Sequence, residues 1–245
     1  MREQVEKWSE DSVPEKTGLA WFFALLLRRF WDFFRASLLL LVGVVPGVLL
    51  TIWGIWGHSL PTALLGGVLG GLIGGLLLCG LYGTILRSLH GEPGFWSLSY
   101  KYTLKRNWRD ALLPGAVLGL ILSLWLFEAV TLGAQGSVSP VTLLALAEVL
   151  FFVLGLSAYV FPQITMVHAS AQKIYSNSIW LFIGLLPRSA ASAAVQTVYW
   201  GVFLLLLPRS VPLLMATGFW LPCLLSMIIL RERMEELLYS GEEAV

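Results

Sequence analysis

The sequence of 245 residues contains few of the side chains on which catalytic and metal sites depend. It has two cysteines and three histidines, with no CxxC pair and no cysteine–histidine cluster. A disulfide framework and a structural zinc site are therefore not expected. The sequence also lacks HExxH, GxSxG and phosphate-loop motifs, which argues against the corresponding enzymes. We expect no catalytic residue, no cofactor and no bound metal.

Charge is scarce as well. Charged residues make up 13% of the chain, whereas hydrophobic residues make up 57%. This balance excludes a water-soluble domain as the main part of the protein. The apolar runs are continuous and do not alternate with polar residues, which predicts membrane helices and not the strands of a barrel. The expected fold class is all-α, a polytopic membrane protein with interfacial amphipathic helices on its cytoplasmic side.

Six apolar runs are each long enough to cross about 30 Å of hydrocarbon. The predicted spans cover about residues 36–57, 61–86, 111–133, 141–167, 189–207 and 211–230. They form one integral membrane domain, residues 18–238, between a polar tail at 1–17 and a C-terminal tail at 239–245. Because no small-residue cleavage site follows the first apolar run, we expect no cleavable signal peptide.

Positive charge falls almost entirely on one side of these spans. Of the sixteen Lys and Arg residues, only Arg209 lies in a turn on the other side. Basic residues mark the cytoplasmic face of a membrane protein. Both termini of this multi-pass protein are therefore predicted to be cytoplasmic.

Three segments on the predicted cytoplasmic side, residues 21–35, 95–109 and 171–186, are rich in aromatic residues, and the first two are also basic. Such composition is typical of helices that lie in the headgroup region. Two interpretations stay open: anchoring in the lipid bilayer, or docking of a cytoplasmic protein partner. Nucleic acid is not expected as a partner, because these segments are too aromatic and too close to the membrane. The candidate residues are Arg28, Arg29, Arg35, Lys101, Lys105, Arg106, Asn107 and Arg109.

The second predicted span carries two overlapping GxxxG tracks on adjacent stripes of one helix. Without Cβ atoms, a neighbouring backbone can approach such a helix closely. Packing within the chain, self-association into a homo-oligomer and docking on a partner's helix are the open interpretations. The residues are Gly66, Gly67, Gly70, Gly71, Gly74 and Gly75.

Two acidic residues, Glu128 and Glu148, lie well inside apolar runs. An intramembrane carboxylate is costly, which makes it a candidate functional group. The third span runs outward and the fourth returns, so the two acids could lie at similar depth and form a proton- or cation-responsive pair. The alternative is that both lie at the outer interface, with Arg209 as a salt-bridge partner.

Several short segments resemble those of a known family. They are Leu86–Trp96, with Arg87 before Gly91-Glu92, then Leu104–Gly115 with its Lys105-Arg106-Asn107, Tyr159–Pro162 and Ser176–Ser178. With these segments the chain is similar, from about Phe22 to Leu238, to the YesL-like family of bacterial integral membrane proteins, a domain of unknown function. It departs from that family in having Ser37 where Asn is usual and in its long glycine-rich second span. The resemblance implies a bacterial inner-membrane protein without known catalytic residues, of a kind often found beside carbohydrate ABC importers and sensory systems.

We therefore expect a non-enzymatic inner-membrane accessory or interaction protein. It would assist a carbohydrate ABC importer or a membrane sensor by binding the permease or the sensor kinase. The alternative is a small-solute or ion transporter that uses Glu128 and Glu148. Against transport stand the absence of inverted repeats and of polar clusters within the predicted spans.

Overall fold

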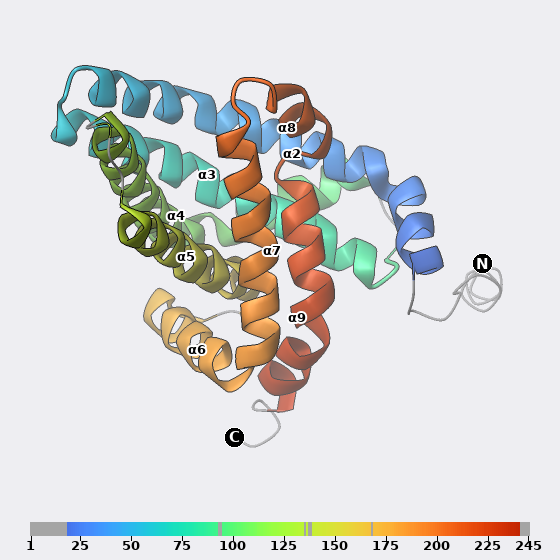
Figure 1. The fold of residues 1–245 in the computed structure, drawn as a ribbon. Coiled ribbons are helices and arrows are strands. Elements are labelled where there is room, and N and C mark those ends of the chain that lie inside the picture. Colours follow the sequence, from blue (N-terminus) through green and yellow to red (C-terminus); the bar gives the residue numbers. More distant parts are fainter. Residues whose placement is uncertain (1–18, 93–94, 135, 137–138, 168, 241–245) are drawn as a thin grey trace, which may run out of the picture.

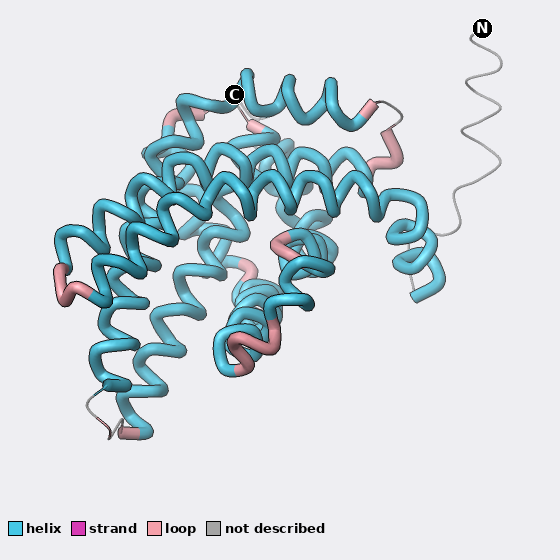
Figure 2. The backbone as a smooth tube through the Cα atoms, turned by 90° about the horizontal axis from the view of Figure 1, so that it is seen from above, coloured by secondary structure: helices cyan, strands magenta, loops and turns pink. Residues whose placement is uncertain are grey.

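The computed structural model describes residues 19–92, 95–134, 136, 139–167 and 169–240. The predicted tail at 1–17 lies outside this part of the chain, as do residues 241–245. All regular elements in the described part are helices, which confirms the expected all-α class (Figures 1 and 2). They are α2 (Leu19–Trp56), α3 (Leu60–Leu89), α4 (Trp96–Ala134), α5 (Pro140–Met166), α6 (Ala171–Gly184), α7 (Leu186–Leu205), α8 (Val211–Thr217) and α9 (Trp220–Ser240).

Four helices, α2 to α5, are each long and apolar enough to cross a membrane. The pairs α6–α7 and α8–α9 meet this criterion only as bent units, with 103° and 51° between their members. Length and composition thus give four to six spans, where the sequence predicted six. The predicted sixth span, 211–230, is broken in two at Gly218, which has a φ of +49°.

Two of the three expected interfacial helices are not separate elements. Residues 21–35 belong to α2, and residues 96–109 form the first turns of α4, while only α6 stands apart as a third helix. No glycine or proline interrupts the chain where a break was expected, so each segment continues into its span. At 1.5 Å per residue, α2 and α4 reach about 57 and 58 Å, nearly twice the thickness of the hydrocarbon.

The helices α2, α3 and α4 form one layer, with α3 between the other two. Figure 1 shows α7 and α9 lying side by side and crossing this layer steeply, with α8 near α2. From Cys79 to Leu89 every residue of α3 except Arg87 is buried, and Tyr82 and Ile85 lie in the core with Phe33 of α2. The first half of α3 instead leaves Leu65, Leu69 and Ile73 exposed. The core therefore lies toward the end of the bundle where the basic residues gather.

Candidate functional site

Both glycine tracks of α3 make close backbone contacts within the chain. One track faces α2, where a Cβ on Gly70 would lie 3.2 Å from the Cα of Gly47. The other faces α4, where a Cβ on Gly71 would lie 2.9 Å from the Cα of Gly119 and overlap the carbonyl oxygen of Gly115. Gly66 belongs with the first track, and Gly67 and Gly75 with the second. The tracks thus hold three helices together at the separation that only glycine allows.

The glycine surface of α3 is also the floor of an apolar groove between α2 and α4. The groove has a volume of about 240 Å³. Its walls include Val44 and Val48 of α2 and Leu118 and Leu122 of α4, and Phe219 lines it as well. Glycines on the floor make the groove deep, because they contribute no side chains to fill it.

The two candidate acids do not form a pair. The indole Nε1 of Trp125 donates a hydrogen bond of 2.8 Å to the carbonyl oxygen of Leu146, which joins α4 to α5 close to both acids in the sequence. Both side chains are exposed, and neither has a hydrogen bond or ion pair to any described residue.

The exposed face of α4 gives a scale for membrane depth. Residues spaced by three or four along this face are Tyr102, Arg106 and Arg109, then Leu113, Val117, Leu120 and Leu124, then Glu128. Arg109 and Glu128 are nineteen residues apart, or about 28 Å along the helix. This distance is close to the ~30 Å of hydrocarbon, so Arg109 and Glu128 are spaced like the two ends of a stretch that crosses a membrane.

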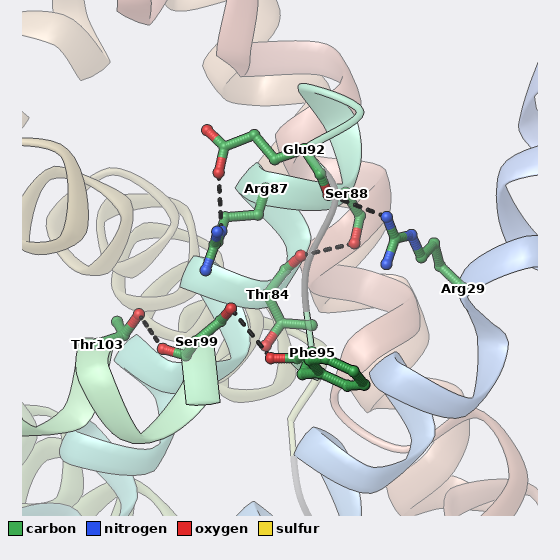
Figure 3. Close-up of polar contacts among 8 residues, drawn as sticks. All are labelled: Arg29, Thr84, Arg87, Ser88, Glu92, Phe95, Ser99 and Thr103. Atoms are coloured by element: carbon green, nitrogen blue, oxygen red, sulfur yellow. Dashed lines mark hydrogen bonds and ion pairs between the residues drawn. The ribbon is translucent and has the colours of Figure 1, made fainter. Parts of the chain in front are cut away.

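Arginines tie the first turns of α2 to the turn between α3 and α4 (Figure 3). Arg29 donates to the carbonyl oxygen of Glu92 at 3.0 Å and also lies 3.3 Å from Asp32. Arg87 at the end of α3 donates to the Glu92 carboxylate at 2.8 Å. These contacts hold the long extensions of α2 and α4 next to each other. Because of these contacts, Arg29 is not one of the cations without a partner.

An open cleft of about 430 Å³ lies where these extensions meet. It is lined by Asp32 and Arg35 of α2 and by Phe95, Trp96 and Ser97 at the start of α4. The indole Nε1 of Trp96 is buried and has no hydrogen-bond partner among the described residues. In this cleft a charged rim thus surrounds aromatic side chains.

Exposed cations and exposed apolar side chains lie on the ends of α2 and α4 that form the cleft. None of the cations in this group forms an ion pair with a described residue: Arg28, Arg35, Lys101, Lys105, Arg106 and Arg109. Arg109 instead lies over the ring of Trp108, 5.1 Å from its centre. Leu27 is 85% exposed and Phe95 80%, and Trp31 and Leu98 are exposed as well. We call this set of cations and apolar residues the basic-end surface.

Asn107 does not belong to the basic-end surface, although the sequence placed it there. Its side chain is 1% exposed, because this position of α4 faces the interior of the bundle. The side-chain oxygen Oδ1 has no hydrogen-bond partner among the described residues. Asn107 is therefore a residue of the helix interface and not of a docking surface.

Buried polar contacts join the later helices, which the sequence did not predict. Gln196 of α7 donates to Ser226 of α9 at 3.1 Å. Tyr159 of α5 and Ser189 of α7 lie 2.6 Å apart, and the pair Gln163–Ser178 joins α5 to α6 at 2.8 Å. The signal was present in α7, where Ser189, Ser192 and Gln196 fall on one helical face.

These buried groups have the character of structural contacts. They are neutral hydroxyls and amides that bond to one another, as polar residues do between membrane helices. Both cysteines, Cys79 and Cys223, are buried with free thiols. No three His, Cys, Asp or Glu residues of the described chain lie close enough to hold a metal ion.

The fold and the surfaces described above define a class, an all-helical protein with helices able to cross a membrane. No family model, curated protein or solved structure matches the chain.

Proposed function

We propose that this protein is a non-enzymatic accessory protein of the bacterial inner membrane that docks a partner protein at its cytoplasmic end. The observation that carries this proposal is the basic-end surface, where exposed apolar side chains and cations without an ion pair to any described residue share the ends of α2 and α4. A large exposed apolar patch with a polar rim is typical of a protein interaction site. The cations would select a partner with an acidic surface and speed its association.

The length of α4 favours protein over lipid as the occupant of this surface. If Arg109 lies at the edge of the hydrocarbon, Leu98 lies about 16 Å and Phe95 about 21 Å beyond that edge. The headgroup layer is only about 5–8 Å thick on each side. Lipid headgroups therefore account for Arg106 and Arg109, whereas Leu98 and Phe95 would face water unless a protein covers them.

The resemblance to YesL-like proteins suggests what the partner is. A permease of a carbohydrate ABC importer, or a membrane sensor kinase, would present both membrane helices and cytoplasmic loops. Either could contact the bundle and its basic-end surface at once. This part of the proposal rests on the resemblance and not on the geometry.

The transporter alternative has less support. It needs Glu128 and Glu148 to converge, and both side chains are exposed without a hydrogen bond or ion pair to any described residue. The side-chain hydrogen bonds that join the later helices are between neutral groups, Tyr159–Ser189, Gln163–Ser178 and Gln196–Ser226. Both observations agree better with a scaffold than with a path for a solute.

Site-specific photo-crosslinking in living cells tests the docking proposal. A photoreactive amino acid is placed at Leu98 on the basic-end surface, or at Leu69, which is exposed on the apolar half of α3. We expect Leu98 to form an adduct with one protein, and Leu69 to form adducts with phospholipid. The protein adduct should disappear when Lys101 and Lys105 are both changed to Glu. Adducts with phospholipid alone at Leu98 would overturn the proposal and support headgroup anchoring.

A further inference from the structure

The first half of α5 is an uncovered apolar surface that carries one charge. Val141 is 75% exposed, and Leu143, Leu144 and Phe152 are exposed too. The carboxylate of Glu148 lies among these residues, without a hydrogen bond or ion pair to any described group.

The position of Glu148 makes this surface unsuited to lipid alone. Glu148 stands eight residues after Pro140, about 12 Å along α5 from its start, with apolar side chains exposed before and after it. An unpaired carboxylate that faces acyl chains there is costly, and such residues pair with an opposite charge or a hydrogen-bond donor. Glu148 therefore calls for a cation that no described residue of this chain brings to it.

Arg209 is the complementary group. It lies in the turn between α7 and α8, and it is the one cation of the sequence predicted to lie on this side of the membrane. Its side chain is exposed and has no ion pair with a described residue. Around it the turn is apolar and open, with Leu205 85% exposed and Leu206 and Leu207 exposed as well. A long arginine side chain can extend from such a turn toward a charge below the interface.

We propose that two copies of this chain form a symmetric dimer through the first half of α5 and the α7–α8 turn. Glu148 of each copy bonds to the partner's Arg209. A twofold interface uses the same patch on both copies, so one complementary pair occurs twice. The chain thus supplies both charges and both apolar surfaces, and neither charge has an ion pair with a described residue of the same copy. Charge-assisted contacts between arginine and carboxylate are among the strongest hydrogen bonds available.

Charge exchange tests the pairing. The full-length protein is reconstituted in liposomes over a range of protein-to-lipid ratios, and single-molecule photobleaching counts the copies. We expect the wild type to dimerise, and Glu148→Arg or Arg209→Glu to raise the dissociation constant by about tenfold or more. The double variant that carries both changes should restore dimerisation. Glu128→Arg is the matched control, since it makes the same charge change at another exposed position, and it should leave dimerisation unchanged.

Cysteine crosslinking gives a second, independent test that does not depend on charge variants folding. Both native cysteines are buried, which keeps background crosslinking low. In membranes, Ala145→Cys combined with Leu207→Cys leaves Glu148 and Arg209 in place, and a short bismaleimide should join these exposed positions into a covalent dimer, whereas Leu69→Cys with Leu207→Cys should form none. A monomeric wild type at every ratio would overturn the proposal. So would a charge-exchanged double variant no better than the single ones, or no covalent dimer through positions 145 and 207. These results bear only on the dimer, because docking at the basic end does not depend on it.

Discussion

Replacement of Gly71 by alanine tests the packing of α3 against α4 most sharply. The added methyl group would overlap the carbonyl oxygen of Gly115 and lie 2.9 Å from the Cα of Gly119. All of these atoms belong to backbone, so no side chain can rotate away, and the helices must move apart. Since carbon atoms pack at about 3.5–4.0 Å, the required movement is at least about 0.6 Å.

The expected loss of stability follows from this movement of the helices. A gap of about 0.5–1 Å forfeits a quarter to a half of each dispersion contact along the interface. Overpacked positions typically lose about 1–3 kcal/mol, and a contact between two backbones falls at the upper end of this range. We therefore expect Gly71→Ala to lower the free energy of unfolding by about 2–3 kcal/mol.

The assay is reversible unfolding in mixed micelles of dodecyl maltoside and SDS, followed by tryptophan fluorescence. Gly201→Ala is the matched control, because a Cβ at Gly201, which also lies inside a helix, meets nothing within 4 Å. It should leave the free energy of unfolding unchanged or raise it by up to about 1 kcal/mol, because alanine has the higher helix propensity. If both variants unfold at the same SDS fraction as the wild type, the close contact between α3 and α4 does not exist and the reasoning is refuted.

Two further substitutions test the break in the last span and the buried polar contacts. Gly218→Ala should lower the free energy of unfolding by about 1–3 kcal/mol, because φ is +49° at this position and the new Cβ would overlap the hydroxyl of Ser37. A melting temperature equal to that of the wild type would contradict this prediction. Gln196→Leu removes the donor to Ser226 and should lower the free energy of unfolding by about 0.6–1.7 kcal/mol in the SDS titration. Gln172→Leu, at an exposed position, should leave this free energy unchanged. Equal effects of the two substitutions would speak against an interhelical contact.

The ends of the early helices are predictable because local signals set them. The turn between α2 and α3 contains Gly57 and His58, and Pro61 stands in the first turn of α3. Ser139 caps α5 by accepting a hydrogen bond of 3.1 Å from the backbone N–H of Thr142, and Pro140 begins the helix. Glycine, proline and N-cap serine act within a few residues, so the sequence alone places these boundaries well.

The basic ends of α2 and α4 could not be predicted in the same way. A basic, aromatic segment has the same composition whether it lies in the headgroup layer or continues a span. The distinction comes from tertiary contacts, above all those of Arg29 and Arg87 with Glu92. Asn107 shows the same limit, since only the packing of α4 decides that this residue is buried while its basic neighbours stay exposed.

The break between α8 and α9 also depends on distant residues. Gly218 is compatible with a continuous helix, but the Ser37 hydroxyl accepts a hydrogen bond of 2.8 Å from the backbone N–H of Phe219. This bond joins residues 182 positions apart, so no local pattern reports it. The polar face of α7 could have been predicted from the sequence, because Ser189, Ser192 and Gln196 follow helical spacing in an apolar run.

Co-purification of a partner tests the central claim, docking at the basic end, most directly. The C-terminus is tagged, the protein is extracted from native membranes into lipid nanodiscs, and the bound proteins are identified and quantified by mass spectrometry. The account predicts a stoichiometric ABC permease or sensor kinase with the wild type, retained by Arg209→Glu and lost when Lys101 and Lys105 are both changed to Glu. A wild-type protein that purifies without such a partner, or a partner that the double variant still retains, would contradict it.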